Sequence, residues 1–151
     1  MDKLNLPPFD YVLRKQEGKV FILDIIRKKY LVLTPEEWVR QHFIHYLIHH
    51  LNYPRALLKV EGGLQYNRLQ KRTDIVVYNR EGTPWMVVEC KSPSQKINRQ
   101  VVNQASVYNA SLKAKYITIT NGLIHFCCVI DWETKQTATL DTLPAYEQYA
   151  G

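Results

Sequence analysis

The sequence lacks the features that mark a membrane-bound or exported chain. None of its apolar runs approaches the roughly 20 residues that are needed to cross a bilayer. Its first residues, Met1-Asp2-Lys3-Leu4-Asn5-Leu6-Pro7-Pro8, contain no apolar segment of the kind found in signal peptides. We therefore expect a cytoplasmic protein with no membrane partner.

Cysteine is scarce, and its three copies are poorly placed for crosslinks. Cys127 and Cys128 are adjacent and, like Cys90, lie in apolar, strand-like stretches. This pattern indicates free, buried thiols in a reducing compartment, and it argues against a disulfide framework or a zinc knuckle. The sequence also has no internal repeat, low-complexity tract or linker, which predicts a single domain over residues 1–151.

Apolar residues and positive charge are plentiful. Of the 151 residues, 46% are hydrophobic, which is enough for one ordinary core. The 20 basic residues outnumber the 14 acidic ones, and the formal net charge is +6. This balance favours a polyanionic partner such as a nucleic acid, although a charge of this size also suits ordinary solubility.

Periodicity and turn residues predict an N-terminal β-hairpin followed by an α/β core. In Thr34-Pro35-Glu36-Glu37, Thr34 can cap a helix, Pro35 suits its first position and Glu37 completes a capping box. This helix should end near Leu51, and a second long helix is expected over 97–113. The remaining segments predict the hairpin at 21–26 and 30–33, strands at 57–66, 73–78, 85–91, 115–120 and 123–130, and another hairpin within 131–140. The order of these elements predicts an α/β sandwich on one mixed sheet.

Two of the expected strands carry charge beside Val and Ile. Asp74 directly precedes one apolar run, and Glu89 and Lys91 follow another. Because alternate residues of a strand share a face, Glu89 and Lys91 should point together and Cys90 away from them. Two carboxylates and an ammonium on adjacent strands can hold a divalent cation and activate water. The alternative is a solvent-facing salt bridge.

The spacing of these charges resembles a known nuclease signature. Asp74, fourteen intervening residues and then Glu89-Cys90-Lys91 resemble the D…(D/E)-x-K pattern of the PD-(D/E)XK nuclease superfamily, with Thr73 in place of the family's proline. The chain is more closely similar to the N-terminal nuclease domain of type I restriction enzyme R subunits. That similarity rests on five segments in the same order: Thr34-Pro35-Glu36-Glu37-x-Val39-Arg40-Gln41, Arg72-x-Asp74-Ile75-Val76-Val77-Tyr78, Val88-Glu89-Cys90-Lys91-Ser92-Pro93, Gln104-x-x-x-Tyr108-Asn109 and Thr120-Asn121-Gly122.

The resemblance implies a fold, a reaction and a set of partners. The fold is a restriction-endonuclease-like αβββαβ core with a mixed sheet flanked by helices, in a single nuclease-like domain. The reaction is hydrolysis of DNA phosphodiester bonds with Mg²⁺ or Mn²⁺ held by Asp74 and Glu89, and Lys91 completes the catalytic trio. The implied partners are DNA and the motor or specificity subunits of a restriction or defence system. The chain has no G-x-x-x-x-G-K-[ST] motif, so it lacks a P-loop motor of its own.

The second helix carries two further candidates, Gln104 and Tyr108. They fall on a stripe that should face the sheet, formed by Ile97, Val101, Gln104, Tyr108 and Leu112. From the residues alone, Gln104 reads as a buried amide bonded to a strand-end carbonyl, and Tyr108 as a packing residue. The resemblance instead implies that Gln104 is catalytic and reaches Lys91 or the substrate, with Tyr108 binding substrate beside it.

Two residues near the site, Glu37 and Glu61, have two interpretations each, and Arg40 has one expected role. Glu37 either closes the capping box or approaches the metal, as the resemblance implies. Glu61 either supplies a third metal-binding carboxylate or is an ordinary exposed strand residue. Arg40 is expected to pair with Glu36 or Glu37.

The first helix also carries a histidine face. His42, His45 and His49 share that face with Trp38, and the i, i+4 spacing of two of them could hold zinc. Since no third strong ligand is apparent, we expect a solvated or partner-facing stripe.

Basic residues gather in the sequence around the proposed site, and they suit phosphate contacts that carry no sequence information. They are Arg68, Lys71, Arg72, Lys91, Lys96 and Arg99, of which Arg72, Lys96 and Arg99 are candidate substrate-binding residues. The sequence thus predicts a metal-dependent DNA endonuclease with little intrinsic sequence specificity. The alternative is a non-catalytic module on the same fold that binds nucleic acid or a protein partner.

Overall fold

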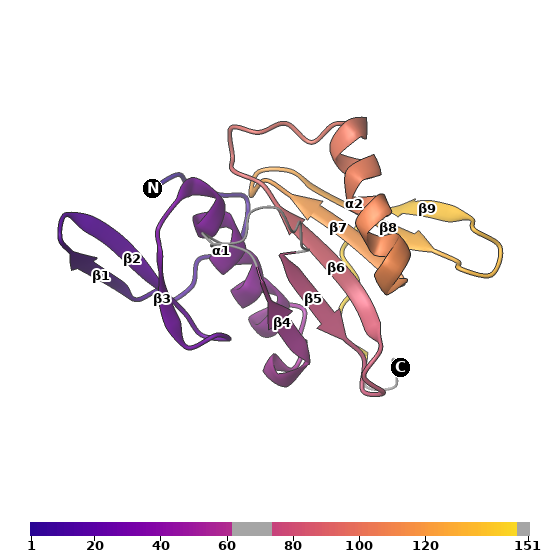
Figure 1. Ribbon diagram of the computed structural model, residues 1–151, viewed down its shortest axis with the longest axis horizontal. Helices are drawn as coiled ribbons and strands as arrows, with labels where there is room; N and C mark the ends of the chain where they lie inside the picture. The colour runs from indigo at the N-terminus through magenta and orange to yellow at the C-terminus, as the bar shows by residue number, and fades with distance from the viewer. Residues whose placement is uncertain (62–73, 148–151) are drawn as a thin grey trace.

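The protein is seen in a computed structural model that describes residues 1–61 and 74–147 (Figure 1). Its main sheet has six strands in the order β4-β5-β6-β7-β8-β9. The strands are β4 (Leu58–Val60), β5 (Ile75–Tyr78), β6 (Pro84–Cys90), β7 (Tyr116–Thr120), β8 (His125–Ile130) and β9 (Thr137–Leu140). All neighbours are antiparallel except β6 and β7, which are parallel. The crossover between β6 and β7 is the helix α2 (Arg99–Leu112), as a parallel connection requires.

The predicted αβββαβ core is confirmed. The helix α1 (Pro35–His49) and a short 3₁₀ turn (Arg55–Leu57) precede β4, and the order α1, β4, β5, β6, α2, β7 follows the expectation. The two helices cover opposite faces of the sheet. Phe43 and Leu47 of α1 lie in one core cluster with Val88, whereas Val101 of α2 lies in another with Val87. Neither helix of the described ranges combines the length and apolar character that a bilayer crossing needs.

The start of α1 follows the sequence prediction in part. The Thr34 hydroxyl oxygen accepts the backbone N–H of Glu37 at 3.0 Å, and Pro35 begins the helix. The Glu37 carboxylate, however, accepts hydrogen bonds from Arg40 and Gln41. The capping function of Thr34 is therefore confirmed. The Glu37 carboxylate instead takes part in buried hydrogen bonds with Arg40 and Gln41.

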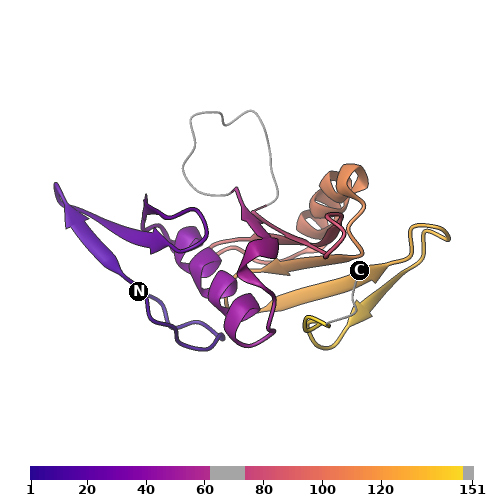
Figure 2. The same cartoon turned by 90° about the horizontal axis from the view of Figure 1, so that it is seen from below.

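The N-terminal hairpin is part of a larger unit than the sequence predicted. The strands β2 (Lys19–Asp24) and β3 (Lys29–Val32) form the expected hairpin, and β1 (Leu13–Gln16) adds a third antiparallel strand. In both views α1 lies between this small sheet and the six-stranded sheet (Figure 1, Figure 2). The sequence of β1 gave no strand signal because Leu-Arg-Lys-Gln contains no β-branched or aromatic residue.

The histidine face of α1 is covered by the protein itself. His42 and His45 are buried, and the Phe9 ring stacks on His45 with centroids 4.3 Å apart. The Trp38 indole donates a hydrogen bond to the backbone oxygen of Asp2. Burial lowers the pKa of His45 to about 4, so this ring is neutral. The predicted solvated or partner-facing stripe is wrong for His42 and His45, because the N-terminal segment packs over them.

The prediction of free, buried thiols is confirmed. Cys90, Cys127 and Cys128 are all free and buried. Cys90 belongs to the cluster that α1 covers, on the face opposite Val87, as strand alternation predicted.

Candidate active site

The three residues of the predicted trio meet at one end of the sheet. Ile75 pairs with Val88, so Asp74, just before β5, lies opposite Glu89 of β6. Lys91 follows the end of β6, where its backbone N–H bonds to the Thr120 carbonyl. The Lys91 ammonium lies 3.5 Å from a Glu89 oxygen.

The carboxylate of Asp74 is buried and held from two sides. Its Oδ1 accepts hydrogen bonds from Arg40 Nη2 at 2.6 Å and Nε at 3.1 Å. Its Oδ2 accepts the backbone N–H of Cys90 at 2.8 Å. These contacts fix the orientation of Asp74 and leave one lone pair of Oδ2 unused by them, since each carboxylate oxygen has two.

Arg40 is the centre of a buried charge cluster. Its guanidinium lies 2.7 Å from Glu36, 2.7 Å from Glu37 and 2.6 Å from Asp74, and the residue is fully buried. Burial opposes its charge, but the charges of Asp74 and Glu37 raise the pKa of Arg40 above its ordinary value. The sequence predicted a pairing with Glu36 or Glu37. The structure shows both contacts, and a third with Asp74, which is 34 positions away and directly precedes β5.

A chain of hydrogen bonds extends this cluster to the N-terminal sheet. The Gln41 amide donates to Glu37 Oε2 at 2.9 Å and to Asp24 Oδ2 at 3.1 Å. Asp24, at the end of β2, also accepts the Arg27 side chain and the backbone N–H groups of Ile26 and Arg27. Burial opposes the charge on Asp24, but these hydrogen bonds and the Arg27 charge together lower its pKa. The small sheet is thereby joined to Asp74 through buried side chains only.

Glu89 sits in a different electrostatic environment. Its side chain is 16% exposed. Burial, and then the charge of Asp74, raise the pKa of Glu89 to about 8, against the opposing effect of Lys91. A second negative charge beside Asp74 is therefore disfavoured unless a cation balances it, which is the electrostatic condition of a metal site.

The donor chemistry of this end of the sheet suits Mg²⁺ or Mn²⁺. Asp74 and Glu89 offer carboxylate oxygens on adjacent strands, and hard cations accept one or two carboxylates with water and substrate phosphate. Within residues 1–61 and 74–147, no three His, Cys, Asp or Glu side chains are grouped so that they could hold a metal ion. The carboxylates of Asp74 and Glu89, which lie opposite each other, could hold such an ion.

The two weaker metal candidates differ in position. Glu37 is buried, and its two oxygens contact Arg40 and Gln41. Glu61 follows β4, and its backbone N–H bonds to the Asp74 carbonyl, which places it beside Asp74 in the same cross-strand row as Glu89. The Glu61 carboxylate lies 3.2 Å from Lys59. Glu61 therefore lies in the better position for a further acidic group, and both metal assignments stay predictions.

The stripe predicted for α2 is confirmed for Val101, Ile97 and Leu112, which lie in or against one core cluster, and it is wrong for Gln104. The buried residues are Val101, Ala105 and Asn109, and the Asn109 amide bonds to both backbone groups of Ala114. Gln104 is exposed and Tyr108 is half-buried. Gln104 therefore does not form the buried amide expected from the residues alone, and its role on the substrate stays a prediction.

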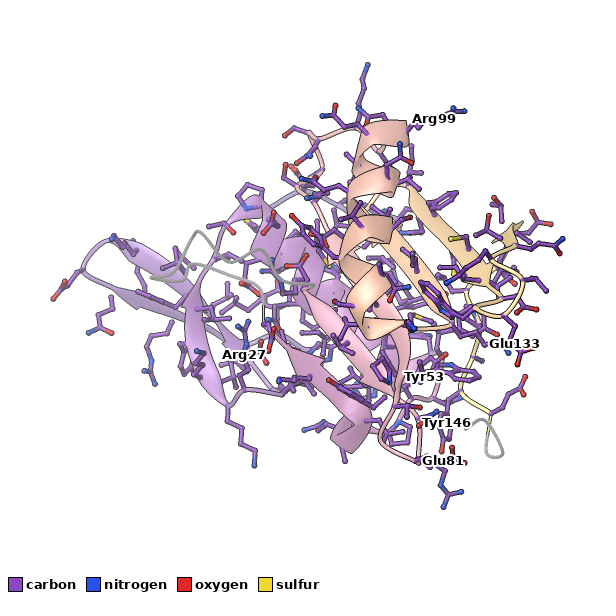
Figure 3. All side chains as sticks on the ribbon, turned by 45° about the vertical axis from the view of Figure 1, so that its right-hand side comes forward. Arg27, Tyr53, Glu81, Arg99, Glu133 and Tyr146 are labelled. Atoms are coloured by element: carbon purple, nitrogen blue, oxygen red, sulfur yellow. The ribbon has the colours of Figure 1, made fainter. Side chains whose placement is uncertain are left out.

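The basic candidates are divided between described and undescribed residues. Lys96 lies in the exposed connection after β6, and Arg99 begins α2 (Figure 3). Arg72, with Arg68 and Lys71, lies outside the described residues.

The sequence did not predict that Arg40 binds Asp74, or that Gln41 connects Asp24 to the same cluster of charges. The available signal was the placement of Arg40 and Gln41 on the apolar side of a helix, where a polar side chain needs a partner. The partner of Arg40 could not be identified because Asp74 is distant in the sequence.

Comparison with known proteins places the chain near one family. Residues 35–144 match the family model described as type I restriction enzyme R protein N terminus (HSDR_N). Among solved structures, one that matches is a fragment assigned as an HsdR subunit of a type I restriction enzyme from Vibrio vulnificus YJ016. It covers 58% of this chain at 28% identity, with a TM-score of 0.38. The match spans 16% of that protein's chain. No curated protein matches.

Proposed function

Because the chain belongs to the family of type I restriction enzyme R protein N termini, we propose that it is a nuclease module that hydrolyses phosphodiester bonds of DNA with Mg²⁺ or Mn²⁺. The observation that carries this proposal is the meeting of Asp74, Glu89 and Lys91 at one end of the sheet. A structural salt bridge between Glu89 and Lys91 would not need Asp74 opposite it. Burial and the charge of Asp74 raise the pKa of Glu89 to about 8, and such shifts are common at functional sites.

Asp74 and Glu89 would hold the cation, which when bound activates water and offsets charge on the phosphate. Asp74 is oriented for this by Arg40 and by the Cys90 backbone. Lys91, whose side chain is 19% exposed, would donate hydrogen bonds to a phosphate oxygen as its negative charge increases during hydrolysis. On α2, the exposed Gln104 and the half-buried Tyr108 would contact the substrate backbone.

The test is cleavage of supercoiled plasmid in the presence of Mn²⁺ or Mg²⁺. Lys91→Ala should lower the rate by about 100- to 1,000-fold, the usual effect of removing one donor to the reacting oxygen. Lys113→Ala, an exposed lysine at the end of α2, is the matched control and should cleave at the wild-type rate. Wild-type cleavage by Lys91→Ala contradicts the proposed mechanism.

A second candidate function is a non-catalytic module that binds nucleic acid or another subunit. The contact of Arg40 with Asp74 favours it, because Arg40 neutralises a carboxylate that the metal would need. This candidate predicts salt-sensitive DNA affinity, no cation binding and no cleavage. In either case we propose that the module works with the motor or specificity subunits of a restriction or defence system.

A further inference from the structure

The small N-terminal sheet carries most of the net charge of the chain. Residues 13–32 include six basic side chains and two acidic ones, a net +4 out of the total +6. Asp24 and Arg27 pair with each other, so the exposed charges of this region are Arg14, Lys15, Glu17, Lys19, Lys28 and Lys29. This sheet lies outside residues 35–144, which match the family.

One face of this sheet is turned inward and the other outward. The register places Ile22 and Asp24 on one face, and both are completely buried. The seven residues of the opposite face are exposed or half-buried, and none is acidic: Arg14, Gln16, Lys19, Phe21, Leu23, Tyr30 and Val32. The Arg14 guanidinium lies 4.0 Å from the centre of the Tyr30 ring. We call these seven residues the outer face.

The outer face is held in a fixed relation to the candidate active site. The buried contacts from Asp24 through Gln41, Glu37 and Arg40 to Asp74 join the end of β2 to the site. The end of the sheet formed by β1 and β2 projects from the rest of the molecule (Figure 1, Figure 2). From Asp24 to Lys19 the strand extends about 17 Å, over which a DNA duplex presents about ten phosphate charges.

We propose that the outer face binds the phosphate backbone of a nucleic acid. This inference rests on the proposed function for its choice of partner. A carboxylate-free face with two cationic side chains beside two aromatic rings suits a polyanion, and Lys15, Lys28 and Lys29 add charge around it. Phosphate contacts of this kind raise affinity without selecting a sequence.

The test compares DNA affinity at several salt concentrations for the wild type and for Arg14→Gln/Lys19→Gln. The double variant should bind a 30-base-pair duplex at least about 10-fold more weakly, and the slope of log K against log salt should shrink by up to about 2. Both side chains are exposed, so an unchanged thermal unfolding curve is expected. Arg14→Lys/Lys19→Arg keeps both charges and should bind as the wild type does.

The matched control removes two exposed lysines from another part of the molecule. Lys113→Gln/Lys135→Gln alters the end of α2 and the turn between β8 and β9, and it should leave affinity and salt slope unchanged. A single-stranded oligonucleotide of the same length identifies the form of nucleic acid: the form whose affinity falls most in Arg14→Gln/Lys19→Gln is the one that the outer face binds.

Wild-type affinity and salt slope in Arg14→Gln/Lys19→Gln overturn the inference, as does an equal loss in the control. If affinity and salt slope are unchanged in the double variant, the outer face would instead be a surface that binds a protein partner. Failure of the proposed function is a separate observation: the wild type would bind DNA and lose that binding in the variant, yet would cleave no plasmid.

Discussion

The two sides of the candidate site differ in how their charges are satisfied. On the α1 side, Arg40 is fully buried and contacts three carboxylates at 2.6 to 2.7 Å. On the β6 side, Glu89 and Lys91 are partly exposed, and their charged atoms are 3.5 Å apart. Asp74 belongs to both sides, because it contacts Arg40 and lies opposite Glu89.

This difference suggests that the α1 side positions Asp74 and that the β6 side takes part in the reaction. A saturated buried cluster fixes Asp74 but has little freedom to bind anything else. Burial and the charge of Asp74 raise the pKa of Glu89 to about 8, so a bound cation would favour the charged form of this carboxylate. We therefore propose that Arg40, Glu37, Gln41 and Asp24 hold the structure of the site, and that Glu89 and Lys91, together with Asp74, take part in the reaction.

Removing Arg40 should have the largest effect on stability. Arg40→Met leaves Glu37 and Asp74 buried without their cation, which costs about 3–5 kcal/mol of unfolding free energy. Urea denaturation measures it, and Arg99→Met, which changes an exposed arginine, should cost less than about 0.5 kcal/mol. If Arg40→Met unfolds outright, Arg40→Lys retains one charge and should lose less. A loss below about 1 kcal/mol in Arg40→Met would show that the cluster does not hold the site together.

Replacing Asp24 should have an intermediate effect that depends on pH. Asp24→Asn weakens the contacts with Arg27 and Gln41 and should cost about 1–3 kcal/mol at pH 7. Because the pKa of Asp24 is lowered in the folded protein, its stabilisation is present above its ordinary pKa and is lost as the pH falls. The difference between wild type and variant should therefore shrink below about pH 4. Asp141→Asn, an exposed aspartate, is the control; a difference independent of pH would refute the account.

Removing Lys91 should have the smallest effect on stability. The contact of Lys91 with Glu89 is partly exposed and 3.5 Å long, so Lys91→Ala should cost less than about 1 kcal/mol in urea denaturation. The same variant should lose cleavage, and the contrast between the two measurements identifies a reactive residue. A stability loss above about 2 kcal/mol would place Lys91 with the structural side instead.

The sequence predicted the core where its signals were local. Thr34 and Pro35 marked the start of α1, and the Val-rich segments around Asp74 and Glu89 marked two adjacent strands. It failed where distant segments meet: Phe9 covers His45, and Asp74 binds Arg40. The sequence also misjudged which residues of α2 are buried. Ala105 is small and Asn109 is polar, so neither looked like a core residue beside Tyr108, but the Asn109 amide is hydrogen-bonded to Ala114.

The central claim is that Glu89 belongs to a cation site, and titration calorimetry with Mn²⁺ or Mg²⁺ tests it most directly. The wild type should bind the ion, and Glu89→Gln should lose that binding while it remains folded. Glu133→Gln, which alters an exposed glutamate far from the site along the chain, should bind as the wild type does (Figure 3). Wild-type binding by Glu89→Gln, or no binding by the wild type, would contradict the account.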